Sequence, residues 1–140
     1  MRRPVPKRRE RGLLDTSVVI DLNHIDASKL PLELAVSAIT MAELAAGPHA
    51  TNDPAERARR QDRLQRTEVT FDPLPFDDAA ARSYGLIYAA VMSAGRKARG
   101  ARAIDLLIAA VAAANQLPVY TRNPDDFAAL AGVVDVVAIP

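Results

Sequence analysis

Segments typical of strands alternate with segments typical of helices along most of this chain, and the connections between them are short. This alternation predicts an α/β fold in which helices cover both faces of a mainly parallel sheet. In such a sheet, ligands bind outside the carboxyl ends of the strands, where the strand order reverses. Acidic residues follow an apolar segment or open a helix at four places, and we expect them to meet at that edge: Asp15, Glu43, Asp105 and Asp126.

The expected strands are short apolar runs at Arg11–Leu14, Leu34–Ile39, Val69–Leu74, Pro118–Thr121 and Val133–Ile139. The expected helices are Thr16–Leu22, Met41–Ala46, Pro54–Thr67, Asp77–Ala94, Ala103–Asn115 and Pro124–Leu130. Pro73 makes the third strand an edge strand, because proline cannot donate to a ladder hydrogen bond. The alanine-rich helix over 103–115 permits close packing on several sides, so we expect it at the centre. These elements predict three layers, α/β/α, around a sheet of four to five strands.

Composition limits the class of protein. A chain of 140 residues that is 49% hydrophobic suits a single globular domain. It has no cysteine, which excludes disulfides, thiolate metal ligands and a cysteine nucleophile, and which fits a cytoplasmic protein. Charges interrupt the apolar stretches well below the ~20 residues that a membrane helix needs, so we expect no membrane segment.

Positive charge is concentrated at the amino terminus. Met1–Gly12 holds six lysines and arginines and one acid, Glu10, whereas residues 13–140 hold twelve basic and sixteen acidic residues. We therefore divide the chain into a basic, disordered arm over 1–12 and a domain over 13–140. A basic arm on an acidic body suits a nucleic-acid contact. The alternative, a dispensable tail or an upstream start codon, stays open.

Each acid also has a structural explanation. Thr40 and Glu43 fit the two partners of a capping box, as the N-cap and the third residue of a helix. Asn123 and Asp126 fit the same scheme, and Asp15 fits an N-cap for the helix that follows it. Helix capping accounts for each of these acids when it is considered singly. It does not require an acid after nearly every strand.

Asp105 is the hardest acid to explain in structural terms. It sits among Ile104, Leu106 and Leu107, and a carboxylate in such apolar surroundings needs a partner. Arg102 is one candidate partner, and a metal ion is the other. Carboxylates gathered at one edge repel one another unless a cation holds them. Mg²⁺ and Mn²⁺ suit this role, because both are hard cations that favour oxygen ligands.

The acids lie in segments that match a known pattern. These segments are LDTSVVID at 14–21, AITMAELAAG around Glu43, ARAIDLLIAAVAAA around Asp105, and TRNPDDF at 121–127. In this order they closely resemble the motifs of PIN-domain ribonucleases, and more narrowly those of VapC-type toxins from prokaryotic toxin–antitoxin pairs. The resemblance covers nearly everything from Leu13 to Pro140. It implies a PIN-like domain that hydrolyses RNA endonucleolytically with the help of a metal.

The resemblance also assigns roles to individual residues. The four acids would bind Mg²⁺ or Mn²⁺, with Asp15 and Asp105 as the main ligands. Ser17, Thr121 and Asn123 match the polar positions that support the site. A homodimer and a neutralising VapB-like antitoxin are further implications. Contacts to RNA phosphates are expected from basic residues, namely Arg96, Lys97, Arg99, Arg102 and the arginines of 57–66.

Other functional classes fit the residues less well. A nucleotide-binding domain needs a glycine-rich phosphate loop, and neither G-x-G-x-x-G nor a Walker motif occurs. A receiver domain needs a lysine near the last strand, whereas the lysines here are Lys7, Lys29 and Lys97. A catalytically silent PIN-like domain that only binds nucleic acid remains the main alternative, although it has no need for four intact acids.

Overall fold

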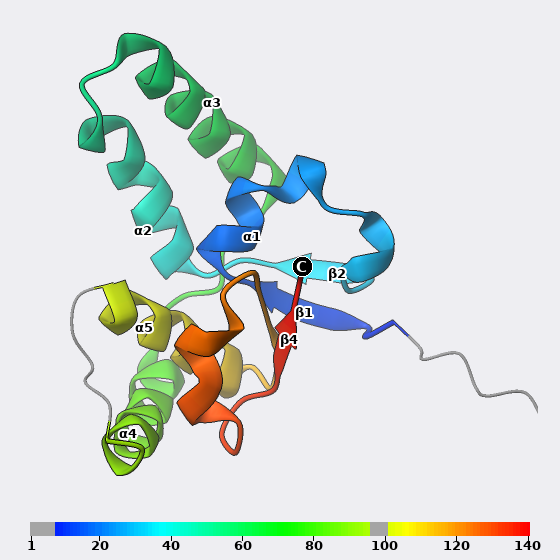
Figure 1. Cartoon of the computed structure of the whole chain (residues 1–140), viewed down its shortest axis with the longest axis vertical. Coiled ribbons are helices and arrows are strands. Elements are labelled where there is room, and N and C mark those ends of the chain that lie inside the picture. The colour runs from blue at the N-terminus through cyan, green and yellow to red at the C-terminus, as the bar shows by residue number, and fades with distance from the viewer. Residues whose placement is uncertain (1–7, 96–100) are drawn as a thin grey trace, which may run out of the picture.

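The computed structural model describes residues 8–95 and 101–140. In this part of the chain, four short strands form one parallel sheet (Figure 1). The order across the sheet is β2-β1-β3-β4, and the bounds are Arg11–Leu14 for β1, Glu33–Ala35 for β2, Val119–Thr121 for β3 and Val136–Ala138 for β4. The strand order reverses between β1 and β3. A ligand site is therefore expected where these two central strands end.

The described α-helices are α1 at Thr16–Ile20, α2 at Ala38–Ala46, α3 at Pro54–Thr70, α4 at Asp78–Ser93 and α5 at Ala101–Ala114. Short 3₁₀ helices lie at Leu22–His24, Ala27–Lys29, Gly47–Ala50 and Pro124–Leu130, and the last of these is η4. Side-chain oxygens of Asp15, Ser37, Asp53 and Asp77 accept N–H groups at the starts of α1 to α4. These caps fix where each helix begins, because they satisfy donors that have no partner within the helix.

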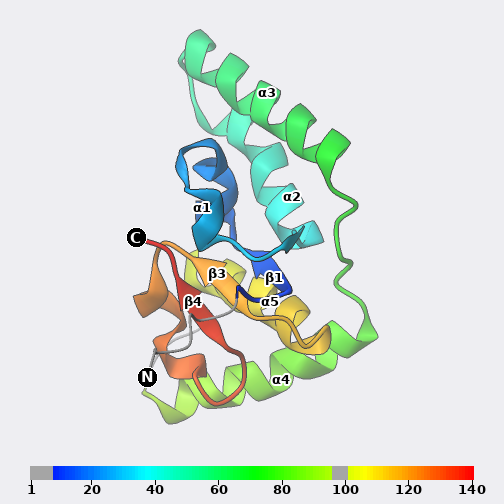
Figure 2. The ribbon, with the colours of Figure 1, turned by 90° about the vertical axis from the view of Figure 1, so that its right-hand side faces the viewer.

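Neighbouring residues of β1 point to opposite faces of the sheet and divide the core in two. Leu13 packs with Val119 and the buried sides of α4 and α5, whereas Leu14 packs with Tyr120 and Val18. Figures 1 and 2 both show α4 and α5 on one side of the sheet and α1 and α2 on the other, with α3 beyond α2. This arrangement confirms the three layers. It also confirms the central place of α5, in which the run 108–112 is fully buried.

The expected strand at Val69–Leu74 is wrong. Helix α3 continues to Thr70, and Leu74 makes only an isolated parallel bridge with Ser37. Val69 is 89% exposed, so its apolar side chain does not indicate burial. The hydroxyl of Thr70 donates to the carbonyl of Arg66 one turn earlier (2.7 Å), a contact that a helical threonine can make. The sheet in the described residues therefore has four strands, the lower limit of the expected four to five.

The structure describes residues 8–12 of the expected amino-terminal arm, and these residues contact the rest of the protein. The guanidinium of Arg8 donates to the carbonyls of Ala27 (2.8 Å) and Leu30 (3.0 Å), and Arg11 pairs with Glu33 in the sheet. Gly12 is buried. The rest of the expected arm, residues 1–7, lies outside the described residues.

The remaining elements match the expected ones with shifted ends. The second strand stops at Ala35, two residues before the cap of α2, and the last strand narrows to Val136–Ala138. The helix expected at Pro124–Leu130 has these bounds but is 3₁₀. Gly95, where α4 was expected to stop, has a φ of 72°, which glycine adopts without strain. Among the described helices, none has the length and apolar character to cross a bilayer.

Candidate active site

Asp15 ends the first central strand and caps the first helix. Its backbone N–H donates to the carbonyl of Tyr120 on β3 (3.0 Å), and the residue is only 3% exposed. The carboxylate oxygen Oδ1 accepts hydrogen bonds from the Ser17 hydroxyl and from the backbone N–H of Val18 (3.2 Å). The N-cap expected from the sequence is therefore confirmed. Both bonds reach the same oxygen, so the cap is compatible with a ligand role for Oδ2.

Ser17 connects Asp15 to the loop that follows β3. Its hydroxyl donates to Asp15 and accepts from the backbone N–H of Arg122 (3.1 Å). The Arg122 guanidinium pairs with Asp21 (2.9 Å) and donates to the carbonyl of Pro140 (3.1 Å). Two segments about a hundred positions apart are thus held together at the carboxyl edge of the sheet. The supporting role expected for Ser17 has a physical basis here, since its hydroxyl occupies one oxygen of a buried acid.

Thr121 and Asn123 shape the same loop. The fully buried Thr121 accepts the backbone N–H of Asn123 with its hydroxyl (2.9 Å). Asn123 is the N-cap of η4, but its side chain makes no capping hydrogen bond. Asp126 is half-buried at the third position of η4, and its backbone N–H donates to the Asn123 carbonyl (3.1 Å). The side-chain exchange of a capping box is therefore incomplete at this helix.

Glu43 approaches the site from α2, and its expected capping role is wrong. Ser37 is the N-cap of α2 and accepts the backbone N–H of Thr40 (3.1 Å), so Glu43 lies beyond the first turn. Its side chain instead accepts a hydrogen bond from the hydroxyl of Thr16. The Thr16 and Thr40 hydroxyls are 3.1 Å apart. The partner of Glu43 is thus the residue next to Asp15, which brings the two acids to the same region.

Asp105 is half-buried near the start of α5, next to the fully buried Leu106. Its expected partner, Arg102, lies in the same helix, but the Arg102 side chain is outside the described part of the structure. The choice between Arg102 and a metal as the partner of Asp105 therefore stays a prediction. The other residues expected to bind RNA at this end of α5 also fall outside the described residues: Arg96, Lys97 and Arg99.

The fold and the position of the acids agree with a sequence match to a known family. The sequence profile of the PIN domain matches residues 12–133. This chain belongs to the PIN-domain family. It is 39% identical over 128 residues to ribonuclease VapC5 of Mycobacterium tuberculosis, and the match covers 89% of this chain and 91% of that protein. A second relative in that species, ribonuclease VapC8, is 38% identical over 102 residues, which cover 72% of this chain and 89% of the relative.

Solved structures of PIN-domain relatives show the same fold. The VapBC-5 toxin–antitoxin structure of Mycobacterium tuberculosis contains a chain that is 39% identical, with a TM-score of 0.79 over 93% of this chain and 98% of that one. The FitAcB structure of Neisseria gonorrhoeae matches at 28% identity and a TM-score of 0.65, over 89% of this chain and 94% of that one. The family and the fold inferred from the motifs are thus confirmed.

The donor chemistry of this PIN domain suits a hard cation, although the described side chains form no closed metal cage. Asp15 and Glu43 supply carboxylate oxygens, and hydroxyls of Ser17 and Thr16 hold them from the side. Within residues 8–95 and 101–140, no three acidic, histidine or cysteine side chains are arranged to hold an ion. Two of the four acids are therefore each held by a hydroxyl of α1, Asp15 by Ser17 and Glu43 by Thr16. Convergence of the full quartet stays a prediction.

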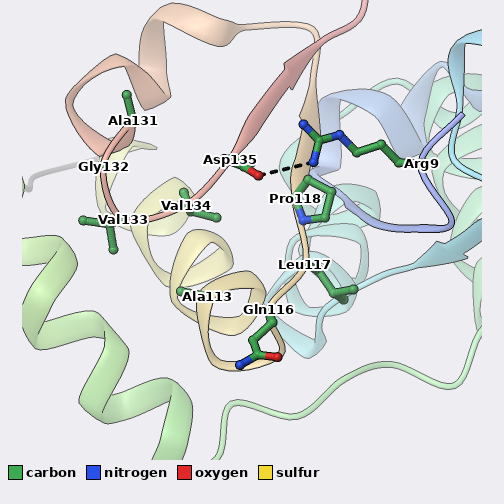
Figure 3. A pocket seen from close by; sticks show the side chains of 10 residues that line it. All are labelled: Arg9, Ala113, Gln116, Leu117, Pro118, Ala131, Gly132, Val133, Val134 and Asp135. Carbon is green, nitrogen blue, oxygen red and sulfur yellow. Dashed lines mark hydrogen bonds and ion pairs between the residues drawn. The ribbon is translucent and has the colours of Figure 1, made fainter. Parts of the chain in front are cut away.

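A hollow of about 320 Å³ lies far from these acids, at the amino ends of the strands (Figure 3). The ion pair between Arg9 and Asp135 (3.2 Å) crosses it, and Gln116, Leu117 and Pro118 line it. It contains none of the residues predicted for the site. Parallel sheets bind ligands at the opposite edge, so this hollow is not the candidate active site.

A second hollow, of about 330 Å³, opens beside the acids between α1, α2 and α3. Thr16, Glu43, Arg60 and Arg63 line it, and Ile20 forms part of its apolar wall. Thr16 had no role predicted from the sequence, although its place directly after Asp15 was a usable signal. Arg63 was not distinguished from the other arginines of 57–66, because sequence spacing alone does not show which of them face this hollow.

Proposed function

We propose that this chain is the toxin of a toxin–antitoxin pair and acts as a metal-dependent endoribonuclease in the cytoplasm. One observation carries the proposal: a buried carboxylate, Asp15, stands at the switch point of a parallel sheet, and the residue next to it holds a second carboxylate, Glu43. Capping alone does not account for Glu43. Relatives over most of the chain are named ribonucleases, which supports RNA as the substrate.

The proposed cofactor is Mg²⁺ or Mn²⁺, held by Asp15 and Asp105 with help from Glu43 and Asp126. When bound, such an ion lowers the pKa of a coordinated water and offsets charge on phosphodiester oxygens. The Ser17 hydroxyl fixes one oxygen of Asp15, and the Thr16 hydroxyl does the same for Glu43. These contacts reduce the rotational freedom of both acids before substrate binds, and preorganisation of this kind favours catalysis.

The proposed partner is a VapB-like antitoxin. The VapBC-5 relative is described as a member of a toxin–antitoxin family. An apolar groove of about 450 Å³ between α2 and α3 supports this partner, since Met41, Leu64, Phe71 and Pro73 line it with alanines of α2. Grooves of this kind accept the apolar face of a helix.

A homodimer is the second proposed assembly. Tyr88 and Met92 lie one turn apart on α4 and are 45% and 51% exposed. The space around Gly85, one turn before Tyr88, is open. An exposed apolar stripe with a small residue at one end suits the close approach of a second, identical helix.

The alternative is a catalytically silent PIN-like domain that binds nucleic acid. The test combines metal binding with cleavage: the purified full chain is titrated with Mn²⁺ by calorimetry and then incubated with total bacterial RNA, whose new ends are mapped by sequencing. We expect one set of defined ends that requires Mg²⁺ or Mn²⁺ and disappears with EDTA. RNA binding without new ends, at any metal concentration, would favour the silent domain.

A further inference from the structure

Four of the five arginines on α3 are held by contacts within the protein. Arg57 donates to the carbonyls of Pro48 and Thr51, Arg59 and Arg60 pair with Glu56, and Arg66 pairs with Asp62. Within the described residues, the Arg63 side chain makes neither a hydrogen bond nor an ion pair. Its five N–H donors are therefore available to a ligand.

Arg63 lines the hollow that contains Glu43 and Thr16. Arg60 lines it too, but its guanidinium is already bound to Glu56 and to the carbonyl of Gly47. Arg63 also lines another hollow, of about 270 Å³, together with Asn23, Thr67 and Thr70. Ile20 is the other residue that the two hollows share. Arg63 thus stands at the junction of a groove that leads from the acids along the side of α3 facing α1.

The charges in this groove favour an anion next to Arg63. Two arginines neutralise Glu56, and their hydrogen bonds and charges hold the pKa of that carboxyl below its ordinary value. The remaining acid in the hollow, Glu43, would repel a phosphate that approaches the site. A guanidinium beside it offsets part of this repulsion. Arginine suits the task, because its planar fork can donate two parallel hydrogen bonds to one phosphate.

We propose that Arg63 binds a backbone phosphate of single-stranded RNA next to the scissile position, and that the strand continues along the hollow lined by the exposed residues Asn23 and Thr70. This inference rests on the proposed function and adds one substrate-binding residue to it. RNA is favoured over a protein partner because charged and hydroxyl side chains are prominent in the hollow beside Glu43, where Thr16, Glu56 and Arg60 line it together with Arg63. The apolar groove on the other side of α2 suits a protein better.

The test compares three variants of the full chain, Arg63→Gln, Arg63→Lys and Arg82→Gln, in binding to a fluorescent single-stranded RNA of roughly 12 nucleotides. Arg82 is the matched control: it is exposed on α4, at the opposite end of the molecule from α3 (Figures 1 and 2), and its side chain has no described hydrogen bond or ion pair. Anisotropy is measured in EDTA, so that no cleavage occurs, at several salt concentrations.

We expect Arg63→Gln to weaken binding on the order of tenfold, because a charge-assisted hydrogen bond is lost, and to flatten the plot of log affinity against log salt by about 0.7. Arg63→Lys should keep most of the slope, since it keeps the charge. Arg82→Gln should change neither quantity. In cleavage assays, Arg63→Gln should raise KM more than it lowers kcat.

Three results would overturn the inference. Equal slopes for Arg63→Gln and the parent would remove Arg63 from the RNA surface. Unchanged RNA binding together with weaker antitoxin binding would assign Arg63 to the protein partner instead. Failure of the parent itself to bind RNA would contradict the proposed function as well as this inference, whereas the first two results leave that function standing.

Discussion

The hydroxyl of Thr16 donates a hydrogen bond to the carboxylate of Glu43, 27 positions further along the chain. This contact links α1 to α2 directly beside Asp15, and the Thr40 hydroxyl lies 3.1 Å from the same oxygen of Thr16. Thr16, Thr40 and Glu43 each contact another member of this group, which restricts the rotamers of their side chains. Among the described side chains, the second acid of the site is therefore positioned by a neutral hydroxyl and has no arginine or lysine partner.

Replacing Thr16 with valine should lower RNA cleavage while changing stability little. Valine keeps the shape of threonine but removes the donor, so Glu43 is free to rotate. The loss of one hydrogen bond costs about 1 kcal/mol in the free energy of unfolding. Thr51→Val is the matched control, since the Thr51 hydroxyl accepts the N–H of Asp53 and is remote from the acids. Equal cleavage rates for Thr16→Val and the parent would remove Thr16 from the site.

Replacing Asp105 with asparagine should abolish cleavage and keep the fold. The change removes a charge at nearly constant volume, and it reduces repulsion among the acids in the metal-free protein. Calorimetric titration with Mn²⁺ should show weaker binding, and circular dichroism should match the parent. Asp78→Asn, an exposed acid in the first turn of α4, should leave both properties unchanged. Full activity of Asp105→Asn would exclude it as a metal ligand.

Replacing Gly12 with alanine should destabilise the protein by about 1–3 kcal/mol, the range for overpacked cores. A Cβ at this position would lie 2.7 Å from Cδ2 of the buried Tyr120 ring and 3.0 Å from Cγ of Pro31. Gly132→Ala is the control, because nothing lies within 4 Å of its Cβ position. Urea unfolding measures both variants. An equal urea midpoint for Gly12→Ala and Gly132→Ala would show that the Tyr120 ring moves aside without loss of stability.

Features that depend on residues close together in the sequence are predicted correctly here, whereas features that depend on contacts between distant segments are not. The strand Arg11–Leu14 and the cap at Asp15 follow from local signals, an apolar run and an acid before a helix, and both are confirmed. The capping box expected at Thr40 is wrong because two hydroxyl residues, Ser37 and Thr40, lie three positions apart at the start of α2, and Ser37 is the N-cap. The choice between them depends on Thr16, whose hydroxyl contacts Thr40 from another element.

Arginine pairing on α3 shows the same limit. The helix carries five arginines and three acids, and i,i+3 and i,i+4 spacing allows several alternative pairings. Glu56 takes two arginines, Arg59 and Arg60, and Arg63 is left facing the hollow next to Glu43. Contacts with the 3₁₀ segment Gly47–Ala50 accompany this outcome, since Arg57 and Arg60 also donate to the carbonyls of Pro48 and Gly47. Local spacing predicts that arginines are present on the surface but not which one is available.

Replacing Met92 with lysine should shift the chain toward a monomer if α4 forms the homodimer interface. A charge at the centre of an apolar contact is costly to bury, since lysine must be desolvated without a partner. Sedimentation velocity over a range of concentrations measures the assembly state. Val69→Lys is the control, because Val69 is an exposed apolar residue on α3 rather than α4. A dimer that persists in Met92→Lys would place the interface elsewhere.

Antitoxin binding and metal-dependent cleavage should exclude each other. Carboxylates at the edge of β1 and β3 are suitable partners for an antitoxin arginine, which can pair with them bidentately. Such a contact would compete with the cation or keep the scissile phosphate away.

Most of the affinity should come from the apolar groove at Met41, Leu64 and Phe71. The measurement is a titration of purified antitoxin into the cleavage assay, with the stoichiometry from calorimetry. Met41→Lys should weaken binding at least tenfold while sparing cleavage by the free toxin, because Met41 does not line the hollow that contains Glu43. Full cleavage by the saturated complex would rule out inhibition at the site.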